Sequence, residues 1–368
     1  MMAITFITAT DSTTVTVNDS SHGALVGDFV TFANADTSNS TLNEQLNNEF
    51  EIQTVPTTNT YTITLASNAA AALSSAGSAN ADYQLNIGIN TVVPGNGWGA
   101  GTWGADGWGE GSSETAGTGG TLRLWSQDNF GEDLIFNQRD GFVFYWDKTL
   151  GTTSRAKNLI ELSDAAPTKS RKVIVSERDR HVICFGANPI GQSEQDRLLI
   201  RFSSQENPFL WTPTATNTAG DLRVGSGSEI VTAVKTRREM IVLTDTSVFS
   251  MQFIGPPFTF GISQLASNIT VRGFNGAVAV GDAVFWMGYD RFYIYDGRVQ
   301  VLPCSVRDHV FQDFNETQSD KVYAGVNSAF GEVFWFYPSQ TNALSNSGTG
   351  ENDKYVVYNY DQKIWYVG

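Results

Sequence analysis

The chain has 368 residues, of which 41% are hydrophobic, enough for two or three domains or for one large domain with an appendage. Its formal net charge of −15 argues against tight binding to nucleic-acid backbones or anionic membranes, because these carry charge of the same sign. No run approaches the roughly 18 apolar residues of a membrane span, and the opening MMAITFITATDS lacks the features of a signal peptide. We therefore expect a soluble protein without membrane anchoring.

Residues 1–88 predict a small antiparallel β module. Short runs of β-branched and aromatic residues alternate with polar turns, and threonine is frequent in them (TTVTV, TYTITL). Because threonine fits a pleated, half-exposed surface, this pattern favours strands. The module is predicted to be a barrel or a sandwich. The Ala/Ser tract at residues 68–81 fits either a short helix or an ordered loop.

Residues 89–120 are a glycine-rich linker arm in which Trp98, Trp103 and Trp108 recur every five residues. Glycine permits unusual backbone angles, and each tryptophan offers a large apolar area with few rotatable bonds. Three roles fit this pattern: the rings pack on the neighbouring domain, dock on a neighbouring subunit, or stack on carbohydrate. We single out these three tryptophans as candidate subunit contacts.

A pattern of three or four short strands recurs five times in residues 121–368. Its clearest copy is AVAVGDAVFWMGYDRFYIYDGRVQ at residues 277–300, where Gly/Asp turns separate apolar runs. Third strands start at residues 142, 198, 248 and 292, with gaps of 56, 50 and 44, and the last strand of the fifth set starts 72 residues later, after a polar excursion. A period of about 45–55 residues is typical of β-propeller blades.

The predicted fold is therefore all-β, with the small N-terminal module followed by a β-propeller of about five blade-like units. Blades bury both faces against their neighbours, which suits the strands FVFYW, VFWMG and EVFWFYP. The pattern stops abruptly at residue 368. We expect either an incomplete ring or a ring that another segment completes.

No pattern of residues indicates catalysis, a metal site or a cofactor. The sequence contains none of the HExxH, EF-hand, Walker or CxxC motifs. His181 follows an Arg-Asp-Arg turn and is expected to be exposed, and Cys184 and Cys304 are expected to be small buried hydrophobic residues. A glycosidase would need two nearby carboxylates. Candidate acids exist, but turn aspartates explain them more simply; they are Asp128, Glu132, Asp133, Asp282 and Asp290.

Residues 255–260 (GPPFTF) follow a predicted strand and are expected to form a stiff protruding loop, since proline fixes φ and cannot donate to a strand ladder. This loop either caps a core or contacts another subunit, and Pro256, Pro257 and Phe258 are our candidate contacts. The basic pairs Arg171-Lys172 and Arg237-Arg238 indicate solvated surface, with an acidic partner as the alternative.

Several phrases together resemble one family of bacteriophage structural proteins. They are LRLWSQDNFGEDL (122–134), LIRFS (199–203), WTPTATN (211–217), MQFIGPPFTF (251–260), WMGYDRFYIYDG (286–297) and LPCSVRD (302–308). The family is that of the tail nozzle proteins of short-tailed phages, also called tail tubular protein B or phage stabilisation proteins. The likeness covers about residues 122–368, and the N-terminal module looks like a β-domain inserted in such proteins. Family members begin earlier and run further, so a partial chain is expected.

The resemblance implies a propeller protomer that assembles into a ring, expected to be sixfold, next to the portal and adaptor proteins of the tail. The ring would hold the genome in and then conduct DNA outward without binding it, in a virion made in the host bacterial cytoplasm. No enzyme activity, metal or cofactor is implied. The alternatives are a receptor- or glycan-binding propeller of a tail tip and, third, a glycan-cleaving enzyme.

Overall fold

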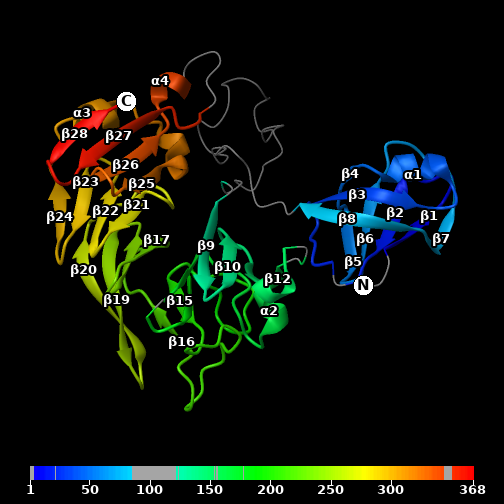
Figure 1. Cartoon of the computed structure of the whole chain (residues 1–368), viewed down its shortest axis with the longest axis horizontal. Coiled ribbons are helices and arrows are strands. Elements are labelled where there is room, and N and C mark those ends of the chain that lie inside the picture. Colours follow the sequence, from blue (N-terminus) through cyan, green and yellow to red (C-terminus); the bar gives the residue numbers. More distant parts are fainter. Residues whose placement is uncertain are drawn as a thin grey trace, which may run out of the picture. The chain divides into compact units, whose positions relative to one another are not determined.

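The computed structural model describes residues 4–84 and 122–368, apart from residues 21, 123, 153, 155, 177 and 344–349. The chain divides into two compact units, Met1–Ile87 and Gly88–Gly368 (Figure 1). Antiparallel strands dominate both units and the helices are short, which confirms the prediction of an all-β chain. The linker arm with Trp98, Trp103 and Trp108 lies outside the described residues.

The described part of the first unit forms two antiparallel sheets and one helix. The strand orders are β5-β6-β2-β1-β7 and β4-β3-β8. The elements are β1 (Thr5–Thr8), β2 (Thr14–Asn18), β3 (Phe29–Asp36), α1 (Ser40–Leu46), β4 (Glu49–Glu51), β5 (Thr54–Thr57), β6 (Thr60–Thr64), β7 (Leu73–Ala76) and β8 (Ser78–Gln84).

These two sheets share one core, in the manner of a sandwich. Phe6, Val17 and Tyr61 of the larger sheet pack with Val30 and Phe32 of the smaller one. The rings of Phe6 and Phe32 meet edge to face with their centroids 5.3 Å apart, a favoured arrangement of aromatic pairs. Of the two predicted alternatives, barrel or sandwich, the described strands fit the sandwich.

The Ala/Ser tract at residues 68–81 is neither a helix nor a simple loop, because it contains β7 and the beginning of β8. Gly77 separates the two strands with φ +87°, a left-handed conformation that glycine adopts without strain. The chain thereby passes from one sheet to the other, and Ala81 of β8 joins the shared core. The small side chains that suggested a helix instead allow this close crossing.

The described part of the second unit contains five four-stranded antiparallel sheets, which we number first to fifth in chain order. Their strands are β9 (Trp125–Phe130), β10 (Asp133–Gln138), β11 (Val143–Trp146) and β12 (Lys157–Asn158); β13 (Lys172–Val175), β14 (Val182–Phe185), β15 (Leu199–Phe202) and β16 (Gly220–Arg223); β17 (Ile230–Lys235), β18 (Met240–Thr244), β19 (Ser247–Gly255) and β20 (Thr259–Ser267); β21 (Ala277–Val280), β22 (Ala283–Met287), β23 (Phe292–Tyr295) and β24 (Val299–Leu302); and β25 (Tyr323–Asn327), β26 (Glu332–Tyr337), β27 (Lys354–Asn359) and β28 (Ile364–Val367). The short helices are η1 (Lys148–Leu150), α2 (Leu159–Leu162), α3 (Arg307–Gln312), η2 (Glu316–Lys321) and α4 (Gln340–Ala343).

Successive sheets of the second unit pack face to face, with a separate hydrophobic core between each pair. The alternation along β18 shows how: Val242 belongs to the core shared with the second sheet, and its neighbours Ile241 and Leu243 belong to the core shared with the fourth. Because side chains of a strand point alternately to opposite faces, one apolar run serves two cores. The predicted two-sided burial is confirmed for VFWM in β22, whose Phe285 and Trp286 belong to two different cores. It is wrong for EVFWFY in β26, where Phe336 is 40% exposed because no neighbouring sheet among the described residues covers that face.

The first strands of successive sheets lie next to one another, since β9 contacts β13, β13 contacts β17, β17 contacts β21, and β21 contacts β25. A turn of the first sheet also contacts η2, the short helix that precedes the fifth sheet. Arg139, in the turn after β10, pairs with Asp320 of η2 at 2.7 Å, and the arginine side chain is only 4% exposed. The two ends of the series of sheets are therefore joined by a largely buried ion pair.

The first and fifth sheets each leave one face without a neighbouring sheet among the described residues. On the first sheet Trp125 is 39% exposed, and its ring packs against Phe136. On the fifth sheet Tyr323, Phe336 and Tyr355 lie in one row across three strands and are 54%, 40% and 37% exposed. The chain thus carries aromatic side chains on both terminal faces.

Both cysteines lie in apolar surroundings, as the sequence indicated. Cys184 of β14 is buried in the core between the first and second sheets, and Cys304 is half-buried against the core of the fourth and fifth. Burial raises the pKa of the Cys184 thiol to about 12 and that of Cys304 to about 11. A thiol is a weak nucleophile under such conditions, because the thiolate is the reactive form.

Candidate functional site

The predicted subunit contacts Pro256, Pro257 and Phe258 lie at the tip of the hairpin formed by β19 and β20, whose nine-residue strands extend beyond the rest of the third sheet (Figure 1). Phe258 is 72% exposed and Ile254 57%. We call residues 254–258 the hairpin tip. The segment that the sequence indicated as a loop is thus shorter than expected, because Thr259 and Phe260 already belong to β20.

The first residues of β20, directly after the tip, are firmly held, in contrast to the tip itself. Thr259 is 4% exposed, and its hydroxyl donates a hydrogen bond to the carbonyl of Thr218 at 3.1 Å. Phe260 packs edge to face on Phe202 of the second sheet, with centroids 4.9 Å apart. A rigid support of this kind presents an apolar tip to solvent at little entropic cost to a later contact.

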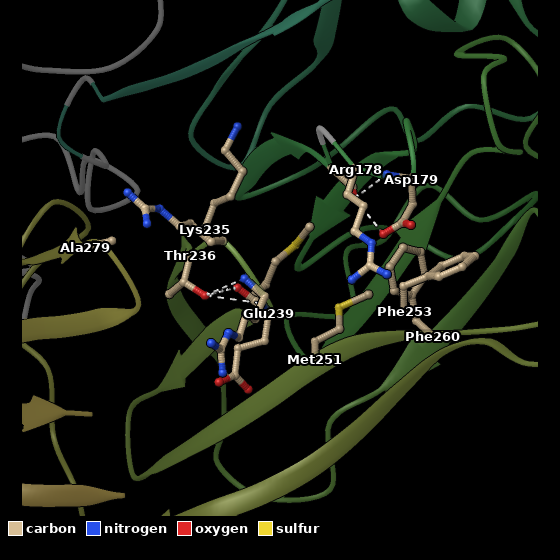
Figure 2. A pocket seen from close by; sticks show the side chains of 14 residues that line it. Arg178, Asp179, Lys235, Thr236, Glu239, Met251, Phe253, Phe260 and Ala279 are labelled. Carbon is tan, nitrogen blue, oxygen red and sulfur yellow. Dashed lines mark hydrogen bonds between the residues drawn. The ribbon is translucent and has the colours of Figure 1, made fainter. Parts of the chain in front are cut away.

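A pocket of about 600 Å³ opens beside the β19–β20 hairpin (Figure 2). Its walls are the turn between β13 and β14, the turn between β17 and β18, the β19–β20 hairpin, and Ala279 and Gly281 at the end of β21, so it lies where the second and third sheets meet and borders the fourth. Met240, Met251 and Phe260 provide an apolar lining. Four cationic side chains stand around it: Arg178, Lys235, Arg237 and Arg238.

Side-chain hydrogen bonds fix both turns of this pocket. The Thr236 hydroxyl donates to the Glu239 carbonyl at 2.8 Å and lies 3.2 Å from the Glu239 amide, which closes the β17–β18 turn. In the β13–β14 turn the Ser176 hydroxyl donates to Asp179 at 3.2 Å. Threonine, serine and aspartate favour such turns because their short side chains reach nearby backbone groups. The cations of the pocket are therefore carried on ordered turns.

The acidic side chains beside the pocket are engaged in the fold. Glu239 accepts hydrogen bonds from Ser250, from Gln252 at 3.1 Å and from the Tyr295 hydroxyl at 2.6 Å. Burial raises the pKa of the Glu239 carboxyl, but these hydrogen bonds outweigh burial and hold the pKa below its ordinary value. Asp179 is buried and pairs with Ser176. No described hydrogen bond or ion pair joins Glu239 or Asp179 to Arg178 or Arg237.

Two of the four cations are already paired. Lys235 lies 2.9 Å from Asp128 of β9, and Arg238 lies 3.3 Å from Asp282 in the turn between β21 and β22. Arg178 and Arg237 are exposed and have no carboxylate partner among the described residues. Figure 2 shows Arg178 extending from its turn toward Met251 and Phe253, so its guanidinium lies over the apolar lining.

His181 is buried beneath this pocket, which corrects the expectation that it is exposed. Its ring packs on Phe260 with centroids 5.1 Å apart, and Nε2 lies 3.2 Å from the Thr218 hydroxyl. Burial lowers the pKa of His181 to about 4, although the nearby Asp179 acts in the opposite direction. The flanking Arg178 and Arg180 suggested an exposed histidine. They do point outward, but the turn directs His181 into the core.

The five acids considered for glycosidase chemistry each have a local partner. Asp128 pairs with Lys235, Asp282 with Arg238, and Asp290 with Arg291. Glu132 pairs with Lys148, and Asp133 accepts a hydrogen bond from Tyr145. Within the described part of the chain, no group of three or more His, Cys, Asp or Glu side chains is arranged to hold a metal ion. None of the described helices has the length and hydrophobicity of a membrane span.

Comparisons with known proteins add little to this geometry. No protein-family model and no curated protein matches the sequence. Among solved structures, the designed protein Ika8 is 10% identical over 64% of this chain and 57% of its own, with a TM-score of 0.37. The endosialidase of phage phi92 is 11% identical over 92% and 46%, with a TM-score of 0.26. A protein of unknown function from Desulfotomaculum acetoxidans is 10% identical over 97% and 83%, with a TM-score of 0.36. Likenesses this weak carry no argument about function.

Proposed function

We propose that the chain is a structural protein of the tail nozzle of a short-tailed bacteriophage, a wall of the conduit for genome DNA, and that it acts without catalysis. The second unit is on this proposal a β-propeller protomer. The face-to-face sheets with adjacent first strands, and the Arg139–Asp320 pair that joins the first sheet to the fifth, support this architecture. The phrases in residues 122–308 that resemble nozzle proteins support the function.

The observation that carries the proposal is the hairpin tip. Phe258 and Ile254 expose apolar area on a protruding hairpin that the Thr259–Thr218 hydrogen bond holds in place directly after its tip. Exposed apolar groups on a fixed support are typical of anchors that enter a pocket on a partner. Contacts between a tip and a different surface of the next copy are heterologous, and such contacts close into a ring when the rotation per copy permits.

The acidic balance of the chain suits a conduit for DNA. With 38 acidic and 23 basic side chains the protein repels phosphate groups at moderate ionic strength, so DNA would pass along the wall without being held by it. The portal and adaptor proteins would be the neighbours of the ring within the virion.

The test is the assembly state of the purified full chain, with Phe258→Asp as the variant. We expect wild type to form closed rings, expected to be sixfold, in light scattering and electron micrographs. Phe258→Asp should weaken assembly by about tenfold or more, because a charge must be desolvated at the contact. Leu150→Asp, at another exposed apolar position that is 55% exposed, is the matched control. A wild-type chain that stays monomeric, both alone and mixed with portal and adaptor, would contradict the proposal.

A further inference from the structure

The pocket beside the β19–β20 hairpin carries positive charge that the described fold does not neutralise. Arg178 and Arg237 lie on two different turns, both exposed, and neither has a carboxylate partner among the described residues. Each turn is closed by its own side-chain hydrogen bonds, at Ser176 and Thr236. The two guanidinium groups are therefore presented by ordered backbone on opposite walls of one pocket.

The lining between these arginines is apolar. Met240 is 6% exposed, Met251 1% and Phe260 3%, and they form the floor of the pocket. Figure 2 shows the Arg178 side chain extending toward Met251 and Phe253. A guanidinium held over apolar side chains is poorly hydrated on one side, so an incoming carboxylate gains a stronger hydrogen bond there than in bulk water. Flexible methionine side chains also adapt to an apolar group that enters with it. The complementary ligand is a carboxylate next to an aliphatic or aromatic side chain.

The charge of the chain itself indicates where such a ligand comes from. An excess of 15 negative charges makes two copies repel each other over most of their surfaces, which opposes any ring. A pocket with two unpaired arginines is a place where an acidic surface is attracted instead. The pocket lies beside the same hairpin whose tip we assign to the subunit contact, so one approach of a neighbouring copy would engage both.

We propose that this pocket binds an acidic segment of a second copy of the chain, with Arg178 and Arg237 as the carboxylate-binding residues and the Met240–Met251–Phe260 floor as the apolar contact. This inference rests on the proposed ring. It adds that the ring is held electrostatically as well as by the hairpin tip, and that its assembly weakens as salt concentration rises. DNA and free anions are the alternative ligands that the experiment must separate.

The experiment compares single charge reversals in the full chain by sedimentation velocity across a salt series. Arg178→Glu and Arg237→Glu should each raise the apparent dissociation constant of assembly by about tenfold at low salt, and the difference should shrink at high salt. Arg298→Glu, at an exposed turn far along the chain, changes the net charge by the same amount. It should shift the apparent dissociation constant by less than about twofold. Unchanged circular dichroism of each variant shows that folding is intact.

A second measurement identifies the partner carboxylate directly. Arg237→Lys keeps the charge and supplies an amine that a carbodiimide can couple to a carboxylate in contact with it. In rings mixed from unlabelled and nitrogen-15-labelled copies, we expect cross-linked peptides that join residue 237 of one copy to an Asp or Glu of the other. Cross-links only within one copy would overturn the proposal.

The outcomes separate this inference from the proposed function. If wild type forms no ring, both fail. If it forms rings that Phe258→Asp weakens while both arginine reversals leave the dissociation constant within about twofold of wild type, only the pocket assignment fails. Retention of labelled DNA or inorganic phosphate that depends on Arg178 and Arg237, with assembly unaffected, would likewise overturn it in favour of a different ligand.

Discussion

The second to fourth sheets and the two terminal sheets use similar strands in different ways. Strands β14, β18 and β22 bury nearly all of their side chains between two neighbouring sheets. Strand β26 of the fifth sheet, with an equally apolar sequence, buries Val333, Trp335 and Tyr337 on one face and leaves Phe336 40% exposed on the other. An apolar run therefore indicates a strand but does not indicate how many of its faces are covered.

The largest effect that tests this difference comes from two neighbouring residues of β26. Trp335 is fully buried, and its indole N–H donates to the Gly276 carbonyl at 3.1 Å. Trp335→Ala should lower the free energy of unfolding by about 3–5 kcal/mol, because it leaves a large cavity in the core and removes the indole hydrogen bond. Phe336→Ala, on the exposed face, should cost less than about 1 kcal/mol. Urea unfolding measures both, and equal losses would mean that the outer face is as tightly packed as the inner one.

A smaller effect is expected at the point where the two terminal sheets meet. Asp320→Ala removes the carboxylate that pairs with the buried Arg139. It should lower the free energy of unfolding by about 1–3 kcal/mol, because the arginine, only 4% exposed, is left without a counter-charge. Glu132→Ala breaks the exposed pair with Lys148 and serves as the control, with a loss below about 0.5 kcal/mol. If thermal unfolding finds both variants alike, the joint between the first and fifth sheets contributes nothing measurable.

The smallest effect concerns pH and the interior between the second and third sheets. The pKa of His181 is about 4 in the fold and about 6.5 when unfolded, so the unfolded chain binds more protons between these values. The contribution of the neutral, buried His181 to the free energy of unfolding is complete above pH 6.5 and is lost as the pH falls toward 4. Between pH 7 and 5, wild type should lose about 1–2 kcal/mol more stability than His181→Gln does. His309→Gln, at an exposed residue of α3, should follow wild type.

The strands that the sequence revealed are those with strong apolar runs. The third strands expected to start at residues 142, 198, 248 and 292 begin at 143, 199, 247 and 292, and the last strand begins at 364 as expected. The outermost strands of the second and fourth sheets were missed, because Gly220–Arg223 and Val299–Leu302 are half-exposed and have few large side chains. In β20 the two prolines before it masked a nine-residue strand.

The candidate site was only partly accessible from sequence. Pro256, Pro257 and Phe258 stood out because proline rigidifies a protruding turn, and they do lie at a hairpin tip. The pocket was missed, since Arg237-Arg238 alone reads as solvated surface. The available signal was positional: Arg178 and Arg237 both occupy the turn between the first and second strands of consecutive sheets, and stacked sheets bring equivalent turns together.

The low nucleophilicity of the two cysteines has a practical consequence. Cys184 and Cys304 are the only thiols in the sequence, and burial keeps both mostly protonated near neutral pH. A cysteine introduced in place of Leu150, at a position that is 55% exposed and outside the proposed contact, would react with a maleimide well before either of them. The wild-type background therefore accepts a single fluorophore away from the hairpin tip, and energy transfer between donor-labelled and acceptor-labelled copies would follow their encounter in real time.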